Sequence, residues 1–187
     1  MSADYDRDLP EIGTERLRAR PLRDADAPAL FAIFREPEVA RFWSSPPMHS
    51  PEQARELIDD IRSEFASGIL HEWGIELREQ PGVIGTCSLS SLSRANRRGE
   101  IGFALHPSAW GRGLIAEMLP RLLDHAFDDL GLHRIEADVD PRNSGSLRAL
   151  ERLGFRVEGR LRDRWQATGE VQDSLILGLL EPEWRQR

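Results

Sequence analysis

The sequence predicts an α+β, or mixed α/β, fold built as a single domain. Three observations predict this class. Strand-like alternation and helix-like spacing of apolar residues occupy separate stretches, residues 101–139 have the order strand, helix, strand, and 187 residues, 40% of them hydrophobic, provide one full core. We expect residues 1–11 to be a flexible polar leader and residues 12–187 to form the domain, with one parallel strand pair in a mostly antiparallel sheet.

The composition argues against several classes of function. With 25 basic and 32 acidic residues, the net charge of -7 disfavours general binding to nucleic-acid phosphates. This charge either attracts a cationic partner or only keeps the protein in solution. No apolar run reaches the roughly 20 residues of a membrane span and none resembles a signal peptide, so we expect a cytoplasmic protein with no membrane partner. Cys87 is the single cysteine and the five histidines lack ligand spacing, so we expect a core cysteine and no metal.

The first half of the chain predicts a strand, two helices and a hairpin. Apolar residues at every second position indicate the strands, and those three and four positions apart indicate the helices. The clearest helix start is Ser50, which precedes Pro51 and stands three positions before Gln53, as in a capping box. The expected elements are a strand at 16–22, a helix from Asp24 to before Pro37, a helix from Ser50 to about Phe65, and a hairpin of 72–77 and 83–92 around Pro81-Gly82.

The second half predicts the crossover and a closing pair of strands. A strand at 100–105 places Ile101, Phe103 and Leu105 on one face. The strongest helical pattern follows, from 114 to 130, with a bend expected at Pro120. The remaining expected elements are a strand at 135–139, a helix at about 144–153 capped by Asn143, and strands at 155–161 and 174–180 joined by a turn at 168–170.

The first chemical signal is a glycine turn between a strand and a helix, with the sequence Trp110-Gly111-Arg112-Gly113-Leu114-Ile115-Ala116. Glycines allow a ligand to approach the backbone closely, and the first turn of a helix carries unpaired amides and a partial positive charge. Such a turn binds phosphate, although it also serves as a plain tight connection. The turn lacks the Gly-Lys-Ser/Thr of nucleotide hydrolases and the three spaced glycines of dinucleotide-binding folds, which disfavours both classes.

The second signal surrounds the next helix and consists of Asn143, Ser146, Glu151, Gly154 and Phe155. The two regions together resemble the signatures of the GNAT superfamily of N-acetyltransferases, and most closely the branch of ribosomal-protein N-terminal alanine and serine acetyltransferases (RimJ/RimL-like). The resemblance spans roughly residues 12–184. Further matching segments are Thr14-Glu15-Arg16-Leu17, Glu100-Ile101-Gly102-Phe103, Glu158-Gly159, Gly169, Asp173 and Glu183-Trp184.

The resemblance implies a twisted sheet of about seven strands with about four helices, in which the fourth and fifth strands splay apart to hold acetyl-CoA. A splayed strand leaves backbone groups unpaired, and a ligand with two amides can bond them. Asn143 is implied to assist, in addition to capping its helix. The other implied coenzyme-binding residues are Phe103, Ala104 and Leu105 for the pantetheine arm and Gly111, Arg112, Gly113, Leu114, Ile115 and Ala116 for the pyrophosphate.

The resemblance also implies direct transfer of the acetyl group to a primary amine, without a covalent enzyme intermediate. Glu100 is the candidate base, and its alternative is a solvated glutamate at a strand end. Ser146 is the candidate acid. The alternative is that Ser146 is only a helix residue and that water is the acid. The tyrosine acid of many family members is replaced here by Leu150. Phe42, Trp43, Trp73 and Trp165 either line the acceptor groove or belong to the core.

The acceptor implied by the resemblance is the α-amino group of a protein or peptide. Two alternatives stay open: a small amine such as an antibiotic, polyamine or amino acid, and a non-catalytic module that only binds acetyl-CoA. An open acidic groove would favour a protein terminus, and a closed pocket would favour a metabolite. A homodimer is left open.

Overall fold

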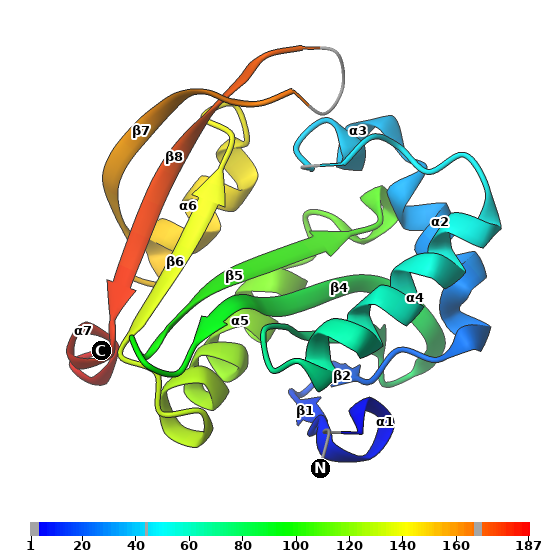
Figure 1. Cartoon of the computed structure of the whole chain (residues 1–187), viewed down its shortest axis with the longest axis horizontal. Coiled ribbons are helices and arrows are strands. Elements are labelled where there is room, and N and C mark those ends of the chain that lie inside the picture. The colour runs from blue at the N-terminus through cyan, green and yellow to red at the C-terminus, as the bar shows by residue number, and fades with distance from the viewer. Residues whose placement is uncertain (1–3, 44, 167–169) are drawn as a thin grey trace.

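The computed structural model describes residues 4–43, 45–166 and 170–187, and in these ranges eight strands form one sheet. The strand order is β1-β2-β3-β4-β5-β6-β8-β7, and every neighbouring pair is antiparallel except β5 with β6 (Figure 1). The α+β prediction and the single parallel crossover are confirmed. The strands are β1 (Ile12–Gly13), β2 (Leu17–Arg20), β3 (His71–Leu77), β4 (Gln80–Ser93), β5 (Arg98–Leu105), β6 (Arg134–Val139), β7 (Arg156–Trp165) and β8 (Gln172–Leu180).

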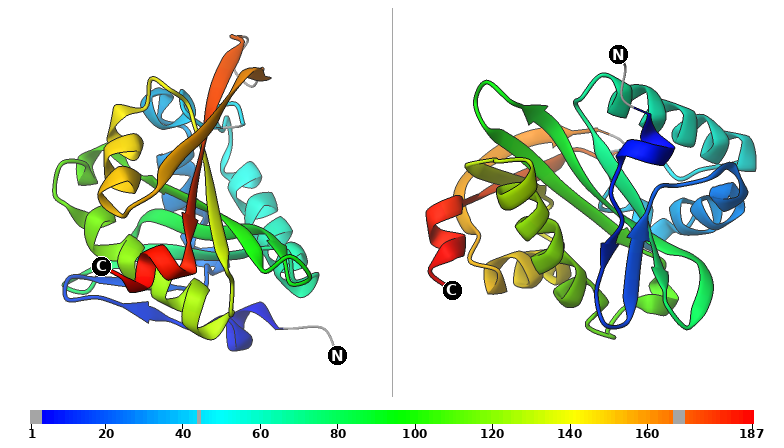
Figure 2. Two further views of the ribbon diagram at one scale, coloured as in Figure 1. Left: turned by 90° about the vertical axis from the view of Figure 1, so that its left-hand side faces the viewer. Right: turned by 90° about the horizontal axis from the view of Figure 1, so that it is seen from below.

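Helices cover both faces of the sheet, as the two side views show (Figure 2). On one face α2 and α4 lie over β3 and β4, and on the other face α5 and α6 lie behind β4 to β8 (Figures 1 and 2). The face of β6 and β8 on the α2 side carries no helix in the part of the chain that is described. The helices are α1 (Tyr5–Asp8), α2 (Ala27–Phe34), α3 (Pro37–Ala40), α4 (Pro51–Ala66), α5 (Leu114–Asp124), α6 (Ser144–Arg152) and α7 (Glu181–Arg185), with short helical turns at η1 (Asp24–Asp26), η2 (Pro107–Ala109) and η3 (His125–Asp129).

The local signals of the sequence account for most element boundaries. The predicted capping box is present at the start of α4, where the Ser50 amide donates to Gln53 Oε1 at 3.2 Å. The helix predicted to reach residue 130 is an α-helix only to Asp124 and continues as one π-turn, η3. Gly131, with φ 64°, follows it. Cys87 is fully buried in β4, in agreement with the predicted core position.

The N-terminal segment is packed where the sequence predicts a flexible polar leader. Tyr5 and Leu9 are each only 3% exposed, at opposite ends of α1. The Tyr5 hydroxyl donates to the carbonyl oxygen of Glu72 at 2.6 Å, and its ring meets Phe65 edge-on at 5.5 Å between centroids. Two apolar residues four positions apart therefore anchor the segment, and the acidic residues between them conceal this pattern in the sequence.

The last two strands are longer than predicted. β7 extends to Trp165 and β8 begins at Gln172, because strand pairing continues through residues whose side chains are mostly exposed and charged. Of the predicted turn at 168–170, residues 168 and 169 lie outside the described residues. The short helices α3 and α7 were not predicted. No helix in the described ranges combines the length and apolar character that crossing a membrane requires.

Candidate active site

The sheet opens between its two parallel strands. β5 and β6 pair at only three positions, Arg98 with Arg134, Gly99 with Ile135 and Glu100 with Glu136. Beyond this point β5 stays paired with β4, and β6 stays paired with β8, so the two strands diverge as a V (Figure 1). These are the splayed strands implied by the sequence, numbered one higher because the two-residue β1 precedes them. The β6-facing edge of residues 101–105 is consequently without a strand partner.

The unpaired backbone groups on this edge belong to alternate residues. In an antiparallel pair, successive residues direct their main-chain groups toward the partner strand and away from it in turn. The amide of His106 donates to the carbonyl of Ile84 in β4 at 2.8 Å, so Ala104 also faces β4. Phe103 and Leu105 face the gap, where Trp110 Nε1 already donates to the Leu105 carbonyl at 2.8 Å. The expected pantetheine contact through Ala104 is therefore corrected: its neighbours Phe103 and Leu105 present the groups.

The glycine turn lies at the open end of the V, after β5. Gly111 and Gly113 have φ values of 71° and 73°, which only glycine adopts without strain, and a Cβ atom at Gly111 would meet nothing within 4 Å. Gly113 is the N-cap of α5 and supplies no side-chain cap; the first internal bond runs from the Glu117 amide to the Gly113 carbonyl at 3.2 Å. The amides of Leu114, Ile115 and Ala116 thus have no acceptor within the helix, and the turn fits an anionic group such as a phosphate.

The side chains of the turn divide into two groups. Leu114 is buried, and Ile115 packs partly against the core, so these residues fix the helix on the sheet. Arg112 and Ala116 are exposed beside the turn. Arg112 is the one cation among the six predicted phosphate-binding residues, and it faces solvent.

The helix after β6 begins at the same open end. Asn143 caps α6 as predicted, since its Oδ1 accepts from the Ser146 amide at 3.1 Å. The Asn143 amide in turn donates to the Asp140 carbonyl at 2.8 Å, which fixes the approach to the helix. Ser146 is half-buried in the first turn, whereas Leu150 is completely buried and offers no proton to the site.

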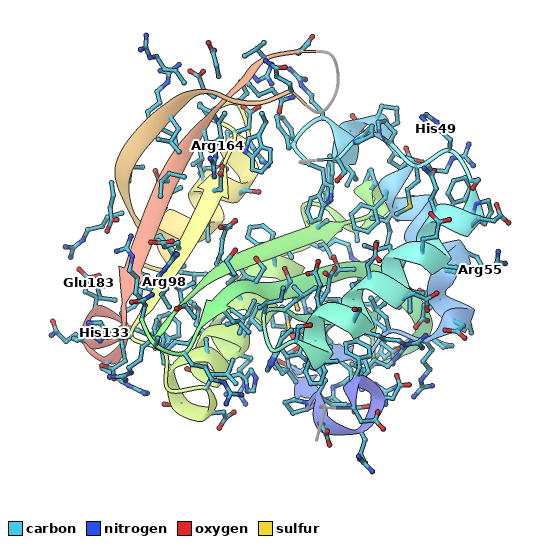
Figure 3. The ribbon with its side chains drawn as sticks, in the orientation of Figure 1. His49, Arg55, Arg98, His133, Arg164 and Glu183 are labelled. Carbon is cyan, nitrogen blue, oxygen red and sulfur yellow. The ribbon has the colours of Figure 1, made fainter. Side chains whose placement is uncertain are left out.

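Glu100 stands at the vertex of the V, at the last position where β5 and β6 pair. Burial raises the pKa of this half-buried carboxyl, and the nearby carboxylates of Asp138 and Glu136 raise it further, against the opposing effect of Arg164 and Arg98. Figure 3 shows Arg98 toward the closed end of the V and Arg164 toward its open end.

The two arginines each form an ion pair with one of the neighbouring carboxylates. Arg98 Nη1 lies 2.8 Å from Glu136 Oε2, and Arg164 Nε lies 3.6 Å from Asp138 Oδ2. Neither Asp138 nor Arg164 was given a place in the site from the sequence. The alternation of β6 could have placed Asp138 beside Glu100, but the reach of Arg164 from β7 had no signal in the sequence.

Comparison with known proteins decides the family. The sequence profile described as "Acetyltransferase (GNAT) domain" matches residues 16–156. The chain belongs to the GNAT acetyltransferase family. The N-acetyltransferase p20 of Bacillus licheniformis is 36% identical over 171 residues, which cover 91% of this chain and 96% of that protein. Mycobacterium smegmatis RimJ, solved in complex with CoA-disulfide, has a TM-score of 0.86 and 27% identity, covering 94% of this chain and 89% of that one.

More distant GNAT relatives carry names that specify different amines. The [ribosomal protein uS5]-alanine N-acetyltransferase of Escherichia coli is 25% identical, with 96% of each chain covered. The spermidine N(1)-acetyltransferase of Vibrio cholerae is 24% identical, covering 92% of this chain and 97% of that protein. The present chain is accordingly an N-acetyltransferase of the GNAT type with acetyl-CoA as its expected cosubstrate, and the family leaves its acceptor open.

Two of the predicted acceptor residues lie in the segment between α3 and α4. Phe42 and Trp43 follow α3 and are half-buried. The Trp43 ring packs on Phe34 at 5.1 Å between centroids. Gln172 at the start of β8 donates from Nε2 to the Arg41 carbonyl at 3.3 Å, which joins this segment to the far side of the V. Phe42 and Trp43 are therefore retained as candidate acceptor residues.

Trp73 is corrected to a core residue. It is 0% exposed, its indole Nε1 donates to the Pro10 carbonyl at 2.6 Å, and its ring meets His125 edge-on at 5.6 Å. It lies on the α5 face of β3 and cannot touch an acceptor. Trp165 at the end of β7 is half-buried, with the Arg164 guanidinium 5.3 Å from its ring centre. Within the described ranges, no three His, Cys, Asp or Glu side chains are grouped to hold a metal ion.

Proposed function

We propose that this GNAT enzyme transfers the acetyl group of acetyl-CoA directly to the α-amino group of a protein or peptide. One observation carries the proposal: a carboxyl with a raised pKa, Glu100, stands where β5 and β6 part, beside the backbone edge at Phe103 and Leu105. The edge suits the amides of a pantetheine arm, and the amides of 114–116 suit its diphosphate. The thioester would then lie near the vertex.

We assign the two proton transfers that amine acetylation needs to Glu100 at the vertex and to Ser146 in the helix that begins at the open end of the V. Glu100, once ionised, takes the proton that the amine loses as its nitrogen bonds to the acetyl carbon; a pKa above the ordinary range makes it a better base at neutral pH. The hydroxyl of Ser146, in the first turn of α6, donates to the sulfur as the carbon–sulfur bond breaks, and Asn143 orients that turn. Leu150 supplies no alternative acid.

The preference for a protein or peptide acceptor rests on the sequence resemblance and on the full-length match to the uS5-alanine enzyme, which point to α-amines of proteins. The charge of Glu136 and Asp138 beside Glu100 adds no support, because arginine side chains pair with both carboxylates. The spermidine enzyme among the relatives makes a polyamine the competing acceptor.

Release of free thiol from acetyl-CoA tests the acceptor directly. Peptides with N-terminal alanine or serine should release thiol, and the same peptides acetylated beforehand at their N-terminus should not. Spermidine and free amino acids are assayed in parallel at equal amine concentration. Turnover with spermidine alone would contradict a protein acceptor, and no release with any amine while CoA still binds would leave a binding module.

The coenzyme site is tested by replacing Gly113 with valine. A β-branched residue at φ 73° is strained and narrows the approach to the turn, so calorimetric affinity for CoA should fall by about tenfold or more. Gly68 provides the matched control, because it has φ 74° and would place a Cβ atom in open space, but lies between α4 and β3. Gly68→Val should lose stability and keep its affinity; equal affinities in the two variants would remove the turn from the site.

A further inference from the structure

Strands β1 and β2 form an N-terminal hairpin. This hairpin is hydrogen-bonded to the glycine turn and the start of α5, which follow about a hundred residues later in the sequence. The carboxylate of Glu117, in the first turn of α5, accepts three groups of this hairpin. Its Oε1 accepts from the Thr14 hydroxyl at 2.5 Å and from the Arg16 amide at 2.8 Å, and its Oε2 accepts from Arg16 Nε at 2.6 Å. The segment Thr14-Glu15-Arg16-Leu17, which contributes to the family resemblance, thus has a structural partner.

The same arginine also holds the other end of the turn. Arg16 Nη1 donates to the carbonyl oxygen of Arg112 at 3.1 Å, and its Nη2 lies 3.8 Å from the position a Cβ atom would take on Gly113. One guanidinium therefore bridges residue 112 before the helix and residue 117 within it. A planar fork of donors can make both bonds at once, which a lysine ammonium on a flexible stem cannot do with the same geometry.

These bonds determine how the turn presents its amides. A trans peptide is planar, with its carbonyl and N–H pointing in opposite directions. When Arg16 holds the Arg112 carbonyl, the Gly113 amide is fixed facing away from the hairpin. Arg16 also compensates the negative charge of Glu117, which would otherwise stand unpaired in the first turn of the helix that receives an anion. Partial burial opposes ionisation of Glu117, but the bonds from Thr14 and Arg16 outweigh it and hold its pKa below the ordinary value.

We propose that Arg16 is a positioning residue for the diphosphate of the coenzyme, acting through the Arg112 carbonyl and Glu117 rather than by direct contact. The inference rests on the proposed function, since it assumes that the turn binds the coenzyme diphosphate. It assigns to the hairpin a role in coenzyme affinity that lies beyond its role as the edge of the sheet.

The test compares Arg16→Ala, Arg16→Lys and Arg78→Ala with the unchanged protein. Arg78 is the matched control, because its Nε donates to the Thr14 carbonyl of the same hairpin at 2.8 Å without touching the turn. CoA affinity is measured by calorimetry, and that of pantetheine, which lacks the diphosphate, by chemical-shift titration. Both Arg16 variants should bind CoA about tenfold more weakly, the loss expected for one charge-assisted hydrogen bond, and should bind pantetheine unchanged. Arg78→Ala should match the unchanged protein with both probes.

The outcomes separate this inference from the proposed function. If the unchanged protein binds CoA and Arg16→Ala binds it equally well, the positioning role is wrong and the coenzyme site stands. If Arg16→Ala loses affinity for CoA and pantetheine to the same extent, the hairpin supports the fold alone and the inference falls. If the unchanged protein binds neither probe, the proposed function and the positioning role fall together.

Discussion

Two glutamates on the same face of the sheet differ in what covers them. Glu72 in β3 is opposite Ser88 of β4, which is opposite Gly102 of β5, two residues beyond Glu100. Burial raises the pKa of both carboxyls, and for Glu72 it reaches about 7 despite a hydrogen bond from Thr86. Glu72 lies beneath α4 and is 9% exposed; at this position β3 is paired with β4, and the Tyr5 hydroxyl donates to the Glu72 carbonyl. Glu100 lies where the pairing stops and remains half-buried.

This difference teaches that a raised pKa alone does not identify a catalytic acid or base. A carboxyl buried between the sheet and a helix can exchange protons but cannot reach a substrate. The same chemical group, placed where two strands part, adjoins unpaired backbone and a second row of acidic side chains. On the proposed function, the opening of the sheet is the reason that Glu100 and not Glu72 is the candidate base, and each of the following changes tests that distinction.

The largest effect is expected from removing the carboxylate at the vertex. Glu100→Gln keeps the size of the side chain but cannot accept the proton, so kcat/KM should fall by about 10² to 10⁴-fold while CoA affinity changes little. Glu72→Gln is the matched control and should retain activity at pH 7. Steady-state kinetics and calorimetry on both variants measure these effects. Equal losses of kcat/KM in the two variants would contradict a special role for Glu100.

The buried carboxyl of Glu72 should instead make the stability of the fold depend on pH. Glu72 has a folded-state pKa of about 7 against an ordinary value of 4.5. Its favourable contribution to the free energy of unfolding is therefore complete below pH 4.5 and is lost as pH rises through 7. Glu72→Gln has no charge to bury and should be more stable than the unchanged protein at pH 8, by up to roughly 3 kcal/mol, with a smaller difference at pH 5. Urea unfolding at the two pH values measures this. Glu79→Gln, exposed in the same hairpin, should show no such trend.

A smaller effect is expected from a neighbour of the open carboxyl. Asp138→Asn removes a negative charge that raises the pKa of Glu100 and releases Arg164, which lowers it. Both changes favour the ionised base, so the acidic limb of the kcat/KM profile should move to lower pH. Asp60→Asn, exposed on α4, makes the same change in net charge and should leave the profile in place. A shift toward higher pH in Asp138→Asn would mean that the limb reports another group.

The fold and the positions of most candidate residues could be predicted from the sequence because each depends on local pattern. Alternation and spacing indicated the strands and helices, and the glycine turn and Asn143 followed from cap chemistry. What depends on packing across the chain could not be predicted. Trp73 shares its alternating pattern with surface strands, and its burial comes from contacts with distant segments, at Pro10 and at His125 of η3. The bonds from Arg16 to Glu117 join residues a hundred positions apart, which no local pattern records.

The smallest effect is expected from removing the proposed acid for the leaving thiolate, because water can take over that role. Ser146→Ala removes the hydroxyl but keeps the amide that donates to Asn143 Oδ1, so α6 stays capped and the fold should be unaffected. Because water can replace a weak hydroxyl acid at an accessible cleft, kcat should fall only a few-fold. Ser144→Ala, exposed in the same helical turn, is the matched control and should behave like the unchanged protein. An unaltered kcat in Ser146→Ala would mean that Ser146 has no role in the transfer beyond its place in the helix. Glu100 would then be the one side chain to which we assign a proton transfer.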